Sequence, residues 1–157
     1  MSKEKTLNLA ITVDDGSRRV PIYNTEGEEI GVFSFHPTDI GIIERYNRLA
    51  GSFDAITEPL EAIRPGEDGA VDLEDPALAG ALAEAGRRLY AAVDALFGGE
   101  GAAQAFFGRM HPFSPVNGEF YCTQVLQKVG EFISAQFDTE TKAMSKRLGK
   151  YLKQAAR

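Results

Sequence analysis

The side chains that could do chemistry are few and lie apart in the sequence. The two histidines, His36 and His111, have no second metal ligand or nucleophile beside them. The single cysteine, Cys122, falls on the apolar side of a predicted helix, where an unreactive thiol is expected. Adjacent strand residues point to opposite faces, so we interpret Asp14 and Asp15 as turn residues rather than a catalytic pair. The motifs of zinc proteases, CxxC redox centres, serine hydrolases and phosphate-binding loops are absent. We therefore expect no catalytic residue and no enzyme.

An acidic segment is the remaining place for a metal ion. Residues 64–75 read "RPGEDGAVDLED", but their carboxylates lack the D-x-D-x-D-G spacing of a calcium loop. We interpret the segment as a loop between helices. The sequence predicts no metal site and no cofactor.

Composition narrows the class of protein. The chain has 157 residues, of which 43% are hydrophobic and 25% charged, as in an ordinary globular domain. Its net charge of −6 disfavours nucleic acid as a partner. No apolar run approaches the roughly 18 residues of a membrane span. The first ten residues lack the apolar stretch of a signal peptide. A single cysteine cannot form an internal disulfide. We expect a cytoplasmic protein with no membrane partner.

The hydrophobic pattern changes at His36 and Pro37. Before this point, apolar residues alternate with polar or small ones, as in half-buried strands, and turn residues such as Asp15-Gly16 separate the runs. Pro21 lacks an N–H and predicts an edge strand or a bulge. The sequence therefore predicts a three-stranded antiparallel sheet within residues 5–36, with strands at "TLNLAITV", "RRVPIY" and "IGVFSF".

Beyond Pro37, apolar residues recur every three or four positions, the mark of amphipathic helices. The first predicted helix covers 40–63, is capped by Thr38 or Asp39, and is kinked or ended near Pro59. A second helix runs from Asp75 to Gly98, and a short turn follows at 102–107. A final helical segment starts at Glu119 and is either continuous or broken near Asp138. The expected core residues are Phe53, Leu82, Leu89, Val125, Val129 and Phe132. The predicted fold class is α+β: a small N-terminal three-stranded antiparallel sheet followed by a bundle of four or five helices.

Two apolar segments are candidates for binding another protein. Four large side chains crowd into eight residues of a Gly- and Pro-rich stretch, where either a satellite core or a partner-binding surface is possible: Phe106, Phe107, Met110 and Phe113. Residues 138–157 carry six basic and two acidic side chains, a charge of +4 that leaves −10 on residues 1–137. We interpret residues 1–137 as a single α+β domain and 138–157 as a basic amphipathic helix or tail, either solvated or docked on a partner. Its apolar residues at helical spacing are Met144, Leu148, Tyr151 and Leu152.

Two stretches carry a resemblance to a known family. They are "FSFHPTDIGIIERYNRL" and "VDALFGGEGAAQAFFGRMHPFSPVNGEFYCTQVLQKV". The first holds Phe35, Asp39 and the Arg45-Tyr46 pair; the second holds an "LFG", "EG" and "FG" series with an extra Gly99. Over roughly residues 5–137 the chain resembles the tail assembly chaperones of long-tailed phages and prophages of Gram-positive bacteria.

The resemblance implies a function that the composition does not. Such chaperones bind the long helical tape measure protein, keep it soluble until the tail tube polymerises around it, and are absent from the mature virion. The implied partners are the tape measure protein and, for a homo-oligomer, further copies of this chain; no catalytic residue carries over. The basic tail matches no motif of the family. The alternatives are another phage structural or head–tail connector protein, or a small-molecule-binding protein or enzyme.

Overall fold

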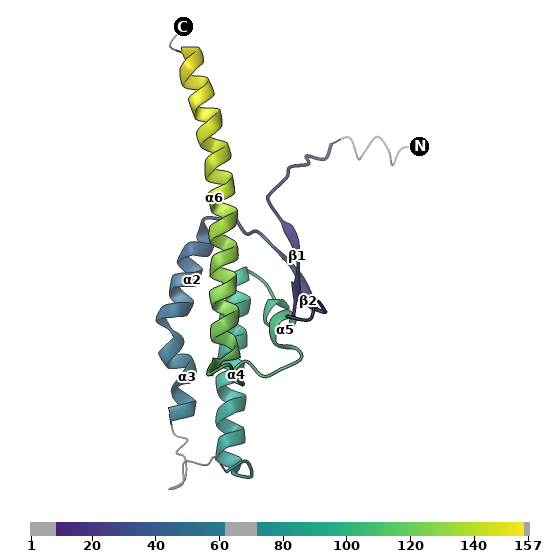
Figure 1. Ribbon diagram of the computed structural model, residues 1–157, viewed down its shortest axis with the longest axis vertical. Helices are drawn as coiled ribbons and strands as arrows, with labels where there is room; N and C mark the ends of the chain where they lie inside the picture. The colour runs from purple at the N-terminus through teal and green to yellow at the C-terminus, as the bar shows by residue number, and fades with distance from the viewer. Residues whose placement is uncertain (1–8, 62–71, 156–157) are drawn as a thin grey trace, which may run out of the picture.

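The computed structural model describes residues 9–61 and 72–155 (Figure 1). Helices α2, α3, α4 and α6 run along the long axis of the molecule, and the β1–β2 hairpin and α5 lie beside them (Figure 1). The elements are β1 (Arg18–Tyr23), β2 (Glu29–Phe35), α2 (Gly41–Gly51), α3 (Phe53–Glu61), α4 (Pro76–Phe97), α5 (Ala102–Phe107), β3 (Pro115–Val116), β4 (Glu119–Phe120) and α6 (Tyr121–Ala155). The mixed helix-and-sheet class is as expected.

The expected three-stranded sheet is wrong for the described residues. β1 pairs antiparallel with β2 alone, in register from Arg18 opposite Phe35 to Tyr23 opposite Glu29. Residues 9–17 form no strand, and residues 5–8 of the predicted strand lie outside the described residues. The reason is a turn before β1. The Asp14 carboxylate accepts a hydrogen bond from the Gly16 N–H, and the Asp15 carboxylate accepts one from the Ser17 N–H. The residues that precede this turn lead away from the sheet (Figure 1).

A second hairpin lies in the Gly- and Pro-rich stretch between α5 and α6. β3 and β4 pair antiparallel around Asn117 and Gly118, whose φ angles are 54° and 85°. Both angles are positive, as a two-residue hairpin turn requires, and Asn-Gly is the sequence that favours it. The Asn-Gly signal is present in the sequence, although Pro112 and Pro115 nearby favour irregular chain. The hairpin ends directly at the first residue of α6.

The change from strand to helix after His36 follows the expected mechanism. Pro37 is buried, and Asp39 Oδ1 accepts a hydrogen bond at 3.0 Å from the N–H of Gly41, the first residue of α2, although the N-cap position itself is Ile40, whose side chain makes no capping bond. At the next boundary, Asp75 Oδ1 accepts from the Ala77 N–H at 2.9 Å, and α4 runs from Pro76 to a left-handed Gly98. The predicted start and end of α4 are therefore confirmed.

The long helix expected over residues 40–63 is divided at Ser52 into α2 and α3, and α3 continues past Pro59 to Glu61. Pro59 has no N–H for the carbonyl of Ala55, four residues earlier. Arg88 of α4 supplies the missing donor, because its Nη1 lies 2.7 Å from the Ala55 oxygen. The proline is tolerated inside α3 because a side chain from a neighbouring helix satisfies the carbonyl.

The core lies between α2, α3, α4 and α6, with Phe35 of the hairpin and the α5 segment closing one side. Of the six expected core residues, Leu89, Val125 and Val129 are buried, and Phe53, Leu82 and Phe132 are half-buried against the same cluster. α6 is one continuous helix of 35 residues, without a break near Asp138. Its first half packs on the body and its second half extends beyond it (Figure 1).

The Arg88–Ala55 contact generates a stability prediction. Replacing Arg88 by Met removes its hydrogen bonds to the exposed Ala55 carbonyl and to Glu84, and we expect a loss of about 0.5–1.5 kcal/mol in unfolding free energy, measured by urea denaturation. In a Pro59→Ala background the restored N–H serves that carbonyl, so the same Arg88 change should cost clearly less. The matched control is Arg87→Met, since Arg87 bonds only Glu84 on the surface. Equal costs for Arg88→Met with and without Pro59 would refute this account of the proline.

Candidate protein-binding surfaces

The aromatic segment around α5 contributes mainly to the core. Phe107 and Phe113 are 3% and 4% exposed, Phe106 is half-buried, and Met110 is 38% exposed. Hydroxyl groups fix the segment in place, since Tyr90 donates to the Phe107 carbonyl at 3.1 Å and Tyr121 to the Phe106 carbonyl. In this fold, Phe107 and Phe113 are not available for a partner, and the satellite-core interpretation fits them.

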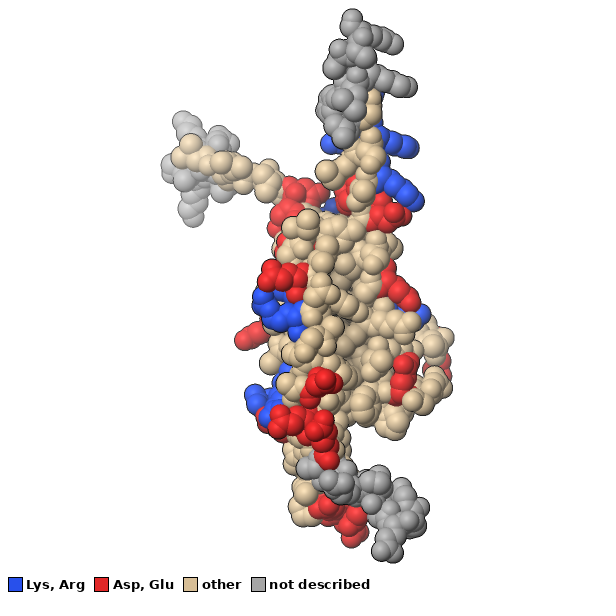
Figure 2. All heavy atoms as spheres, turned by 90° about the vertical axis from the view of Figure 1, so that its left-hand side faces the viewer, with Lys and Arg blue, Asp and Glu red and all other residues tan. Residues whose placement is uncertain are grey.

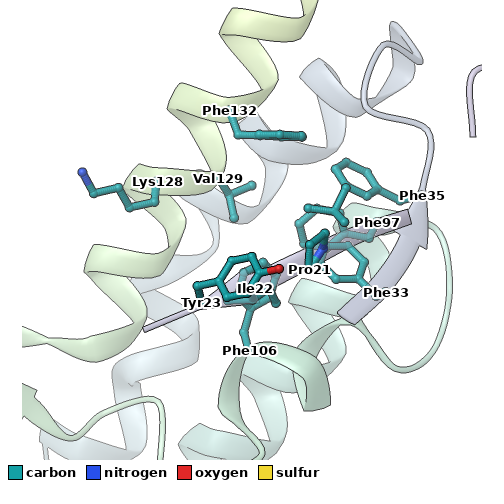
Figure 3. A pocket seen from close by; sticks show the side chains of 11 residues that line it. Pro21, Ile22, Tyr23, Phe33, Phe35, Phe97, Phe106, Lys128, Val129 and Phe132 are labelled. Atoms are coloured by element: carbon teal, nitrogen blue, oxygen red, sulfur yellow. The ribbon is translucent and has the colours of Figure 1, made fainter. Parts of the chain in front are cut away.

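An apolar groove lies between β1 and the first half of α6. It holds about 220 Å³ and opens to solvent, with side chains of the hairpin facing those of α6 across it (Figure 3). We call it the β1–α6 groove; its lining residues are Val20, Pro21, Ile22, Tyr23, Phe33, Phe35, Phe97, Phe106, Lys128, Val129 and Phe132. A second hollow of about 510 Å³ shares Ile22, Tyr23, Phe106 and Lys128 with it and extends towards Met110.

Packed aromatic rings form the floor of this groove. The ring centroids of Phe35 and Phe97 lie 4.8 Å apart, and those of Phe33 and Phe106 lie 5.2 Å apart. Among the described residues, Lys128 is the one charged side chain that lines the first hollow, and its ammonium lies 3.6 Å from a carboxylate oxygen of Glu131. A surface that is apolar apart from Lys128 and the Tyr23 hydroxyl suits apolar side chains. Sequence reasoning identified Phe106 and Met110 but missed the groove, because β1 and α6 are about a hundred residues apart.

The side chains that could act in catalysis or bind a metal ion make structural contacts instead. His36 Nε2 lies 2.8 Å from Asp15 Oδ2, and His111 accepts the Phe113 N–H while its Nε2 faces the Leu82 carbonyl. Burial raises the pKa of Cys122 to about 11, so its thiol stays protonated near neutral pH. Within residues 9–61 and 72–155, no group of three or more His, Cys, Asp or Glu side chains could hold a metal ion.

A second groove separates α2 from α6, and Tyr46 stands between the two helices. The Tyr46 hydroxyl donates to the Leu126 carbonyl at 3.1 Å, and a Cβ atom added at Gly130 would lie 2.9 Å from that hydroxyl. Hollows of about 400 and 420 Å³ flank the tyrosine. Gly130, which weakens α6 as an isolated helix, is what lets Tyr46 cross to it.

The second half of α6 is the most exposed helical surface described. Every side chain from Asp138 to Arg147 is exposed, and Met144 is 69% exposed. The side chains of Leu148, Tyr151 and Leu152 lie outside the described part, although the helix itself continues to Ala155. Basic side chains stand along this part of the helix, above acidic ones where it leaves the body (Figure 2). Lys142 pairs with Asp138 at 3.0 Å.

The comparisons with known proteins give no relative. No family model, no curated protein and no solved structure matches the chain. Among the described helices, none combines the length and the apolar character needed to cross a membrane.

The Tyr46–Gly130 contact gives a prediction with an unusual sign. Ala is favoured over Gly inside a helix by up to about 1 kcal/mol. We nevertheless expect Gly130→Ala to lower the melting temperature, because the new methyl group displaces the Tyr46 hydroxyl from Leu126. The control is Gly149→Ala, which meets no atom within 4 Å and should be neutral or stabilising. In a Tyr46→Phe background the loss at Gly130 should shrink or reverse; an unchanged loss there would contradict the contact.

Proposed function

We propose that this protein is a phage tail assembly chaperone that binds the tape measure protein and keeps it soluble during tail assembly. The resemblance of residues 33–49 and 93–129 to that family motivates the proposal. The observation that carries it is the second half of α6, a helix that leaves the body with its described side chains exposed. The proposal places the chaperone in the cytoplasm of the bacterial host and leaves it out of the finished virion.

The exposed half of α6 continues the stripe that anchors the first half. Buried residues of α6 follow one another at steps of three and four, ending with Ile133, and half-buried Phe137 comes next at the same spacing. Met144 follows Phe137 after seven residues, which is about two turns of the helix and therefore the same face. Leu148 comes four residues after Met144, again on that face. The apolar face that packs on the body thus extends past the body's edge. An isolated helix as short as this exposed half is only marginally stable in water. Packing against a partner would stabilise it, so we interpret the extension as a binding surface.

The tape measure protein fits this surface by its expected chemistry. As a long helical protein, it would present apolar helix faces before the tube surrounds them. An amphipathic helix laid against another helix buries both faces and is a common recognition mode. The net positive charge of residues 138–157 favours an acidic segment of the partner, and the −10 charge of residues 1–137 keeps a loaded complex soluble.

The test is co-expression with the tape measure protein of the same phage. A Met144→Glu, Leu148→Glu double variant should lose most of the soluble tape measure protein, because two carboxylates interrupt the apolar stripe. The control, Thr139→Glu, adds charge at an exposed position on the opposite face of the same helix and should retain the activity. Far-UV circular dichroism should show an unchanged melting temperature for both variants.

Two outcomes would contradict the proposal. One is full solubilisation by the double variant. The other is a melting temperature that falls sharply in the double variant, since this would make the stripe part of the protein's own core.

A further inference from the structure

The segment before β1 exposes three large apolar side chains at alternate positions. Leu9, Ile11 and Val13 are 85%, 92% and 75% exposed. We call residues 9–13 the N-terminal arm. Its alternation is that of a strand with one face buried, yet in the single chain that face contacts water. Such a concentration of exposed apolar surface in a short extended segment indicates that another surface covers it.

Contacts at the base of the arm hold it away from its own sheet. The Asp14 carboxylate accepts the Gly16 N–H at 2.9 Å and lies 3.3 Å from Arg18, while Asp15 accepts the Ser17 N–H at 3.0 Å and contacts His36. The hydrogen bond with His36 lowers the pKa of Asp15, so its carboxylate is ionised at neutral pH and keeps these contacts. The arm therefore points out from the hairpin rather than back along β1 (Figure 1).

The matching surface is the free edge of β1 with the β1–α6 groove beneath it. Within the described residues β1 pairs only with β2, so its other edge has no strand partner. Val20 and Ile22 are the half-buried residues of β1 and line the groove. Val129 and Phe132 of α6 stand across it from Ile22 (Figure 3). A strand added beside β1 would place every second side chain over this opening.

The dimensions and charges of arm and groove agree. Residues two apart in a strand are separated by roughly 6–7 Å, so the three apolar side chains of the arm span about 13 Å, within the length of the six-residue β1. The arm carries no charge between Leu9 and Val13, and the groove is lined by apolar residues apart from Lys128. Pro21 offers a carbonyl but no N–H, so side-chain burial rather than a full ladder of hydrogen bonds holds the arm.

We propose that the N-terminal arm of one copy lies along β1 of a second copy, with Leu9, Ile11 and Val13 over the β1–α6 groove. The second copy is the occupant because the base of the arm directs it away from its own groove. If both copies exchange arms, the contact is self-complementary and closes as a dimer. This inference does not depend on the proposed function, since it concerns only contacts between identical chains.

The first test measures self-association of the full chain by sedimentation velocity over a range of concentrations. The wild-type chain should form dimers or larger closed assemblies. Ile11→Asp should weaken the association at least about tenfold, because the carboxylate enters an apolar groove. The matched control, Thr12→Asp, adds the same charge to the opposite side of the arm and should associate nearly as the wild type does. Both sites are exposed in the single chain. At protein concentrations too low for self-association, neither substitution should therefore change the melting temperature of the monomer.

The second test identifies the contact by cross-linking. One copy carries Ile11→Cys and another carries Tyr23→Cys, at the 59% exposed rim of the groove; the native Cys122 is buried and unreactive. A short bismaleimide should join the two kinds of copy when they are mixed. The same reagent should not join Leu73→Cys copies to Tyr23→Cys copies, since Leu73 is exposed outside the arm.

Three results would overturn the inference. The first is a wild-type chain that stays monomeric at every concentration. The second is Ile11→Asp that associates like Thr12→Asp. The third is cross-linking only within a chain that carries both Ile11→Cys and Tyr23→Cys, which would place the arm in its own groove.

Discussion

Along the first half of α6, apolar side chains at steps of three and four residues are buried against the body, and this packing holds the helix in place. The buried positions are Cys122, Val125, Val129 and Ile133. The helix is longer than the surface that buries it: 35 residues at 1.5 Å each give roughly 50 Å, and the body covers only the first half. Because the helix is continuous, the buried half fixes the direction and the register of the exposed half. An exposed surface on an anchored helix loses less conformational entropy on binding than a free segment does.

The fold shows which features the sequence could reveal. Local chemistry is readable: the Asp39 hydrogen bond at the start of α2, the Asp75 cap and the Gly98 stop each depend on residues close together in the chain. The Asn117-Gly118 hairpin was equally local and was missed because the flanking prolines suggested irregular structure. The division at Ser52 and the tolerance of Pro59 could not be read, since the latter depends on Arg88, 29 residues away in the sequence and on another helix.

The candidate surfaces divide in the same way. That the second half of α6 is exposed can be predicted from the sequence, because no other apolar segment of the chain remains to pack against its apolar residues. The β1–α6 groove does not, because it exists only once Phe33, Phe106 and Val129 are brought together from three separate elements. The alternation at Leu9, Ile11 and Val13 was recognised as a strand pattern. What the pattern could not say is whether a strand partner lies in the same chain.

The central claim is that the exposed half of α6 is the surface that binds the tape measure protein. Amide hydrogen exchange, followed by mass spectrometry with and without that partner, tests it most directly. In the free protein, amides of residues 139–147 should exchange much faster than those of residues 122–133, and the complex should slow the exchange of residues 139–147 specifically. Unchanged exchange in residues 139–147 of a complex that is protected elsewhere would contradict the account.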